Sequence, residues 1–131
     1  MRELTHKDIE LDYIKHSHWT WDEVLNDKEP EYTCLAFIHD GKIKGAISWR
    51  PEVNNTLHIS KIETFPLFRS TGAGKIFMDE LKIYATNKGF DMIDAWCELP
   101  IAPYYIKMDF YETSDTDHVS GEDIVRVEHK L

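Results

Sequence analysis

The sequence predicts a single domain of the α/β (α+β) class that spans residues 1–131. A chain of 131 residues with 42% hydrophobic residues can bury one sizeable core and is too short for two typical domains. Along the chain, runs of β-branched and aromatic residues alternate with segments in which apolar residues recur every three or four positions. The predicted order of elements is strand, two helices, three strands, helix, strand, helix and two strands.

The first part of the chain contains a predicted β-hairpin after two helices. The pair Asp40-Gly41 lies between two β-branched and aromatic runs, and such a pair favours a tight hairpin turn. The expected elements are a strand at residues 2–4, a helix capped by Thr5 that extends through Ile14, a second helix after Thr20 in a region that Pro30 closes, and strands at 32–39 and 42–50.

The second part contains residues that end regular structure. Pro66 ends a strand because proline cannot donate to a sheet ladder, and Gly89 is the predicted stop of an amphipathic helix that starts at Gly74. The expected elements are a turn at 51–55, strands at 57–65 and 90–98, a short helix at 102–108, two strands within 110–131, the second of them at 124–128, and a solvated turn at 115–118.

Composition and charge argue against several classes of protein. The net charge of −9 and the pI of about 5.1 would repel a phosphate backbone, so no nucleic acid is expected as a partner. No run approaches the roughly 20 apolar residues that span a bilayer, and the charged N-terminus does not resemble a signal peptide. We therefore expect a cytoplasmic protein without membrane contact. Cys34 and Cys97 are predicted to be reduced, buried thiols, and neither has a metal-ligand spacing, so no metal site is expected.

A glycine-containing turn between a strand and a helix is a candidate phosphate site. Backbone N–H groups at a helix N-terminus have no intrahelical acceptor, and with the helix dipole they favour an anion such as a pyrophosphate. Gly72 and Gly74 would let phosphate oxygens approach these groups, and Arg69 and Lys75 would add positive charge. The turn is not a P-loop, because Arg69 occupies the first glycine position and Ile76 follows Lys75.

It is not a dinucleotide fingerprint either, because Phe77 stands where a third glycine is required. The segment instead resembles the acyl-CoA motif of the GCN5-related N-acetyltransferase (GNAT) family, Val-x-Pro-x-x-Arg-x-x-Gly-x-Gly/Ala. Residues 64–74 match this pattern with threonine in place of valine. About thirty residues on, residues 102–110 resemble the second family motif and align Tyr105 with its tyrosine. Asp109 replaces the usual glycine, and Glu98-Leu99 stand where many members have an asparagine.

This resemblance implies a mixed, mostly antiparallel sheet of about six to seven strands flanked by about four helices. It also implies an N-acetyltransferase that transfers the acetyl group of acetyl-CoA to an amine acceptor by direct attack. An inactive acyl-CoA-binding module is the alternative, and a homodimer is possible. The implied contacts to the cofactor are the backbone of Ile62, Glu63 and Thr64, then Arg69, Ser70, Thr71, Gly72, Ala73, Gly74 and Lys75, and Tyr105.

The reaction needs an acid and a base. Acetyl transfer releases coenzyme A as a thiolate, whose conjugate acid has a pKa of about 8.5. A phenol of pKa about 10 can return a proton to this thiolate, which makes Tyr105 the candidate acid. His58 and Glu98 are candidates for the base that deprotonates the amine, and a chain of water molecules is the third possibility. Trp19 and Trp21 either line the acceptor site or fill the core, and Trp49 and Trp96 are expected to pack on strands.

Overall fold

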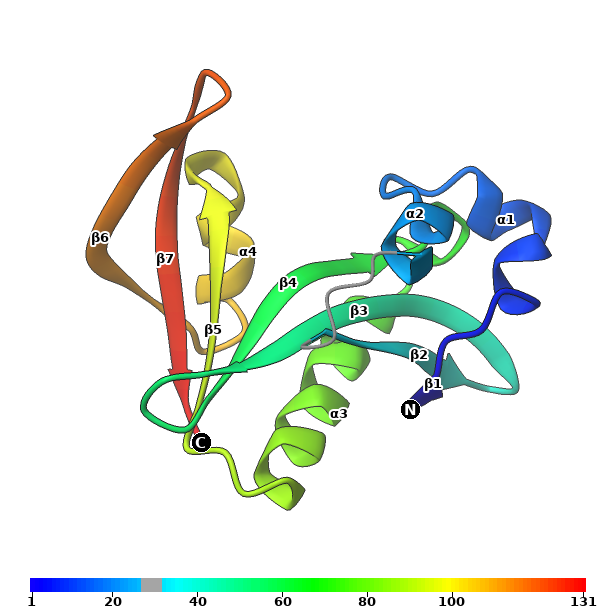
Figure 1. The fold of residues 1–131 in the computed structure, drawn as a ribbon, viewed down its shortest axis with the longest axis horizontal. Coiled ribbons are helices and arrows are strands. Elements are labelled where there is room, and N and C mark those ends of the chain that lie inside the picture. Colours follow the sequence, from blue (N-terminus) through cyan, green and yellow to red (C-terminus); the bar gives the residue numbers. More distant parts are fainter. Residues whose placement is uncertain (27–31) are drawn as a thin grey trace. The chain divides into compact units, whose positions relative to one another are not determined.

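The computed structural model describes residues 1–26 and 32–131 (Figure 1). The strands are β1 (Arg2–Glu3), β2 (Thr33–His39), β3 (Lys42–Glu52), β4 (Thr56–Thr64), β5 (Met92–Glu98), β6 (Tyr111–Val119) and β7 (Glu122–Lys130). The α-helices are α1 (Asp12–Lys15), α2 (Trp21–Asn26), α3 (Ala73–Asn87) and α4 (Ala102–Ile106), and the 3-10 helices are η1 (Asp8–Glu10), η2 (Pro66–Phe68) and η3 (Leu99–Ile101).

The strands form one mixed sheet in the order β1-β2-β3-β4-β5-β7-β6. The β1–β2, β2–β3, β5–β7 and β6–β7 pairs are antiparallel, whereas β4 and β5 run parallel. The parallel register joins residues 56–59 to residues 92–95, and both strands continue beyond it. The mostly antiparallel sheet and the order of elements confirm the predicted fold class.

The chain folds as two compact units. The first unit contains residues 1–50 and 60–80, and the second contains residues 51–59 and 81–131. β4 and α3 each contribute residues to both units.

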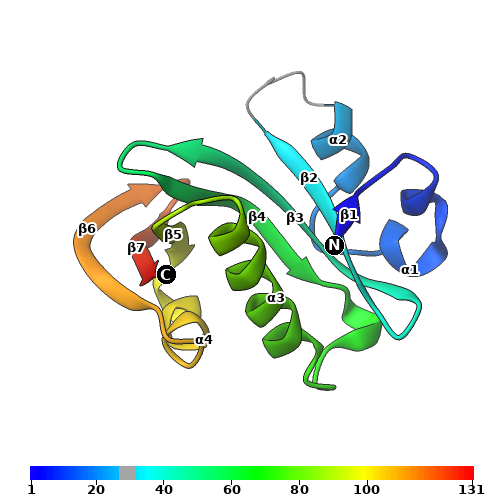
Figure 2. The ribbon, with the colours of Figure 1, turned by 90° about the horizontal axis from the view of Figure 1, so that it is seen from below.

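The first unit is built around the predicted hairpin. Asp40 and Gly41 both have left-handed backbone angles, with φ of 52° and 73°, as a two-residue hairpin turn requires. Figure 2 shows β1, β2 and β3 side by side, in line with their registers. Buried Phe37 of β2 stacks on Phe77 of α3 at 4.6 Å between ring centroids, so the start of α3 packs directly on this part of the sheet.

Gly45 makes that close packing possible. A Cβ atom at this position would lie 2.5 Å from the carbonyl oxygen of Glu63 and 2.7 Å from the ring of Phe77. Neither distance is sterically tolerable, so only glycine fits here without moving β4 or α3.

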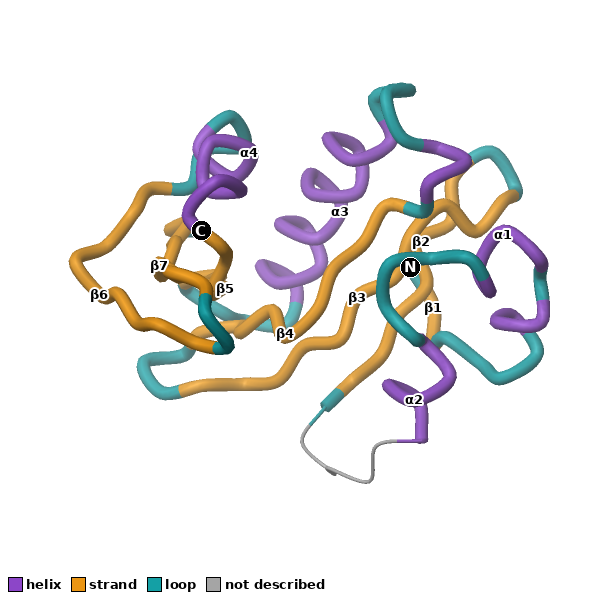
Figure 3. The backbone as a smooth tube through the Cα atoms, turned by 90° about the horizontal axis from the view of Figure 1, so that it is seen from above, coloured by secondary structure: helices purple, strands orange, loops and turns teal. Residues whose placement is uncertain are grey.

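The second unit contains the parallel β4–β5 pair and the C-terminal hairpin. β6 lies beside β7, and α4 contacts both strands (Figure 3). The Nζ atom of Lys82 donates a hydrogen bond to the carbonyl of Met108 at 2.6 Å and so ties α3 to the end of α4. Gly89, with φ of 87°, follows the last turn of α3, and the next N–H bonds back to Ala85 at 3.1 Å.

The first predicted helix is wrong in extent. The Thr5 hydroxyl accepts a hydrogen bond from the Asp8 N–H at 3.3 Å, but Lys7, not Thr5, is the N-cap residue of η1. The carboxylate of Asp8 also binds the Arg2 guanidinium at 2.7 and 2.8 Å, which holds this segment to β1. Leu11 then adopts an extended conformation, with ψ of 132°, so η1 and α1 replace one continuous helix.

Three further predictions need correction. Residues 115–118 lie within β6 and not in a turn, because pairing with β7 makes a strand of an exposed polar segment that has no apolar alternation. Trp96 does not pack, since 41% of its surface is exposed, whereas Trp49 is buried as predicted. β3 continues past Pro51 to Glu52 instead of ending in a turn at residue 51. Cys97 is buried as predicted, whereas Cys34 is only partly buried, and neither forms a disulfide.

Pro30, which is predicted to close the region of the second helix, lies outside the described residues. None of the helices in the described ranges has the length and apolar content needed to cross a membrane.

Replacing Gly45 with alanine should lower the free energy of unfolding by about 2–3 kcal/mol, because the added methyl group overpacks the contact with Phe77 and the Glu63 carbonyl. Gly41→Ala is the control, since nothing lies within 4 Å of its Cβ position and only its positive φ is strained. Its cost should be about 1 kcal/mol. Urea unfolding would measure both, and equal costs would contradict the steric role of Gly45.

Candidate functional site

The predicted phosphate turn connects β4 to α3 within the first unit. After β4 ends at Thr64, the Phe65 N–H bonds to the Lys44 carbonyl at 2.9 Å, and the short helix η2 follows. Ser70 and Gly72 then adopt left-handed angles, with φ of 62° and 85°. These two residues reverse the chain into the first turn of α3.

The turn exposes a series of unused donors. Among the described residues, the backbone N–H groups of residues 70–74 have no backbone or side-chain acceptor. They precede and begin a helix of 15 residues, whose dipole favours a negative charge at this end. Nothing lies within 4 Å of a Cβ position at Gly72, so the space beside that residue is open. Unpaired amides and open space fit a pyrophosphate group.

Two cations lie beside this turn. The Arg69 Nε atom donates to the Thr64 carbonyl at 3.1 Å, and its side chain is 52% exposed. The Lys75 Nζ atom pairs with Asp79 at 2.8 Å on the exposed side of α3. Both side chains remain accessible to an anionic ligand.

The side chain of Glu63 has a role that the sequence did not suggest. Its buried carboxylate accepts hydrogen bonds from the His18 N–H at 2.6 Å, the Trp19 N–H at 3.1 Å and the Trp21 indole N–H at 2.9 Å. Arg69 adds an ion pair at 3.3 Å. Four donors compensate the cost of burying this charge, and they fix the segment before α2 against the end of β4.

This anchor also decides between the two roles considered for the tryptophans. Trp21 is 2% exposed and fills the core, and its indole N–H donates to Glu63. Trp19 is 36% exposed, and Lys61 lies 5.6 Å from its ring centroid. Of these two tryptophans, therefore, only Trp19 offers an aromatic surface to a ligand.

The predicted catalytic residues lie in the second unit. Tyr105 is buried in α4, and its ring meets Phe110 edge to face at 5.3 Å. Burial raises the pKa of the Tyr105 phenol, so this side chain stays protonated. Asp109 stands where the family motif has glycine. It adopts a left-handed φ of 68°, a conformation usually taken by glycine, so the aspartate takes the backbone conformation expected there.

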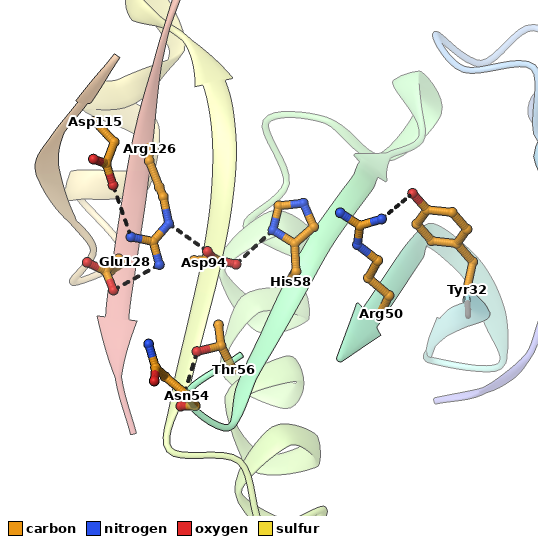
Figure 4. A network of polar contacts seen from close by, with 9 residues as sticks. All are labelled: Tyr32, Arg50, Asn54, Thr56, His58, Asp94, Asp115, Arg126 and Glu128. Atoms are coloured by element: carbon orange, nitrogen blue, oxygen red, sulfur yellow. Dashed lines mark hydrogen bonds and ion pairs between the residues drawn. The ribbon is translucent and has the colours of Figure 1, made fainter. Parts of the chain in front are cut away.

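His58 and Glu98 have different surroundings. The His58 Nδ1 atom lies 2.8 Å from the Asp94 carboxylate, and the Arg126 Nε atom binds the other oxygen of that carboxylate at 2.7 Å (Figure 4). Glu98, at the end of β5, is exposed. Sequence reasoning missed Asp94 because nothing in the spacing of 36 residues indicates that it lies opposite His58.

Replacing Glu63 with glutamine should lower the free energy of unfolding by about 2–4 kcal/mol, because an amide group must then face N–H donors in a buried site. Arg69→Ala is the control. It removes the ion pair and the Thr64 carbonyl bond of a half-exposed guanidinium and should cost about 1 kcal/mol. Denaturant unfolding would test this, and a smaller cost for Glu63→Gln than for Arg69→Ala would contradict the anchoring role.

Several solved structures with the same fold are acetyltransferases. An acetyltransferase from Bacillus subtilis in complex with CoA is 17% identical with a TM-score of 0.75, and the alignment covers 100% of this chain and 95% of that one. The ribosomal-protein-S18-alanine N-acetyltransferase from Escherichia coli is 14% identical with a TM-score of 0.75, covering 98% and 91%. A chimera of the spermidine N-acetyltransferase SpeG from Vibrio cholerae and hSSAT is 12% identical with a TM-score of 0.75, covering 98% and 94%.

The sequence itself identifies the family. No curated protein sequence matches significantly. The model of the acetyltransferase (GNAT) family, however, matches residues 1–110, which include both motifs. The chain therefore belongs to the GNAT family of acetyltransferases, whose members use acetyl-CoA as the acetyl donor.

Proposed function

We propose that the protein is an N-acetyltransferase that transfers the acetyl group of acetyl-CoA to a primary amine. The observation that carries this proposal is the turn of residues 70–74, whose five backbone N–H groups lack acceptors at the start of α3. Such a site suits the pyrophosphate of acetyl-CoA. Residues 69–75 would bind it, with Arg69 and Lys75 adding positive charge, and Ile62, Glu63 and Thr64 would contact the acyl-bearing arm through their backbone.

Tyr105 is the proposed acid. Acetyl-CoA supplies an acetyl group activated as a thioester, and transfer leaves a thiolate that needs a proton. The buried phenol of Tyr105 keeps its proton at neutral pH, because burial disfavours the phenolate. Among the described residues, its hydroxyl has no hydrogen-bond partner, so it can donate to a ligand.

His58 is the proposed base, in preference to Glu98. A primary amine is an ammonium ion at neutral pH and must lose a proton before it can attack. His58 is held by a carboxylate on the neighbouring strand, and its side chain is only 14% exposed. Glu98, by contrast, is exposed at the end of β5. A positioned imidazole suits this proton transfer better.

An amine acceptor agrees with two of the similar structures. One is named for acetylation of an alanine of ribosomal protein S18 and the other for acetylation of spermidine. A protein amine and a polyamine share only the amino group. We therefore propose a primary amine as the acceptor and do not propose a narrower class.

Replacing Gly72 with glutamate should abolish binding of acetyl-CoA, because the new carboxylate would enter the open space beside the N–H groups and repel the pyrophosphate. Calorimetric titration should show micromolar binding by the wild type and no detectable binding by this variant.

Gly89→Glu is a matched control at the other end of α3. Gly89 has φ of 87° against 85° for Gly72, and nothing lies within 4 Å of either Cβ position. The control carries the same charge and strain and should keep wild-type affinity. No binding by the wild type would refute the proposed function, and equal loss in both variants would refute the assignment of the turn.

Replacing Tyr105 with phenylalanine should lower kcat by about 10²-fold, because the thiolate loses its proton donor, with little change in the KM for acetyl-CoA. Tyr104→Phe is the control, since this neighbouring side chain is 45% exposed, and its kcat should change by less than about twofold. A panel of amines would be assayed by thiol release and by mass spectrometry of the product. Binding of acetyl-CoA without acetylation of any amine would favour the inactive binding module instead.

A further inference from the structure

His58 and Asp94 form a pair between two parallel strands. The register of β4 and β5 places the two residues directly opposite each other, so their side chains project on the same side of the sheet. The His58 Nδ1 atom lies 2.8 Å from the Asp94 Oδ1 atom, and the two side chains are 14% and 7% exposed. In Figure 4, Asp94 lies between the imidazole and the guanidinium of Arg126.

Asp94 is ionised in this environment. Burial acts to raise its pKa, but hydrogen bonds from His58 and Arg126 outweigh that effect and lower the pKa below its usual value. The Arg126 Nε atom donates to the Asp94 Oδ2 atom at 2.7 Å, and the same guanidinium binds Glu128 at 3.2 Å and Asp115 at 3.4 Å. Both oxygens of Asp94 are therefore occupied as acceptors.

The ionised carboxylate determines which nitrogen of His58 carries hydrogen. A carboxylate only accepts hydrogen bonds, so the Nδ1 atom must be the donor. In a neutral imidazole the Nε2 atom then carries the lone pair. Among the described residues, this Nε2 atom has no hydrogen-bond partner, and in Figure 4 it points away from Asp94.

We propose that Asp94 is a positioning residue, which holds His58 in the tautomer whose Nε2 atom removes a proton from the acceptor amine. This inference rests on the proposed function. The Nε2 atom takes one proton from the alkylammonium group, which leaves a neutral amine and an imidazolium. The Asp94 carboxylate stabilises that imidazolium, and the proton then passes to water.

The charged groups around this pair come from three strands. Asp94 belongs to β5, Arg126 and Glu128 to β7, and Asp115 to β6. Arg126 thus neutralises part of the negative charge while it orients Asp94 through its Nε atom. A purely structural role of the network, as a link between strands, would affect stability without affecting kcat.

The test is an NMR measurement of the histidine tautomer combined with kinetics. Long-range ¹H–¹⁵N spectra at alkaline pH, where imidazoles are neutral, should show His58 protonated at Nδ1 in the wild type. A His58→Gln variant would identify its signals among the seven histidines. In Asp94→Asn, the amide can donate to Nδ1 and should move the hydrogen to Nε2. Once its signals are assigned, the tautomer of His58 in the wild type is measured without turnover.

The kcat of Asp94→Asn should fall about 10²- to 10³-fold with an amine that the wild type acetylates. Its KM for acetyl-CoA should change less than about twofold. Asp94→Glu keeps the negative charge and should retain the tautomer and most of the activity. Asp91→Asn is the control for the carboxylate-to-amide change, because Asp91 precedes β5 and bonds to exposed Asn55 at 3.1 Å. It should keep wild-type kcat.

Protonation of His58 at Nε2 in the wild type would overturn the inference. So would unchanged kcat in Asp94→Asn after the tautomer has moved. Absence of turnover by the wild type with every amine would instead refute the proposed function, which separates the two failures.

Discussion

The buried carboxylate of Glu63 is the contact on which the end of β4 and the segment before α2 depend. It joins the end of β4 to the segment before α2 through the His18 and Trp19 N–H groups and the Trp21 indole. A buried carboxylate without these donors would be strongly unfavourable. Moving the donors away would therefore cost free energy, and this keeps them in place. The strand end and the exposed face of Trp19 consequently share one anchor, which also pairs with Arg69 beside the phosphate turn.

The sequence predicted the strand, turn and helix of residues 64–74 because the signals for this backbone path are local. Pro66 after the strand, glycine at the left-handed position 72 and the apolar stripe of the following helix all lie within about twenty residues, and each acts through its own backbone. The short helix of Tyr105 was predictable for the same reason. Asp109 shows the limit of such reasoning, since a residue other than glycine occupies the left-handed position there.

The sequence could not predict contacts made by side chains from distant segments. The N–H donors of His18, Trp19 and Trp21 lie 42 to 45 positions from Glu63. The partners of Asp94 lie 32 and 36 positions away. Spacing carries no information over such distances without an established register. The same limit explains residues 115–118 of β6, which are exposed and polar and form a strand only through pairing with β7.

The two titratable groups that frame the proposed chemistry are shifted in opposite directions. Burial raises the pKa of Tyr105, which therefore holds its proton, whereas bonds from His58 and Arg126 lower the pKa of Asp94, which therefore remains charged. Neither group changes its state near neutral pH. His58 is hydrogen-bonded to the charged carboxylate of Asp94 and is the proposed base. In the proposed chemistry the neutral phenol of Tyr105 would donate a proton, His58 would take one and the charged Asp94 would orient the base, so different environments within the second unit would assign different roles.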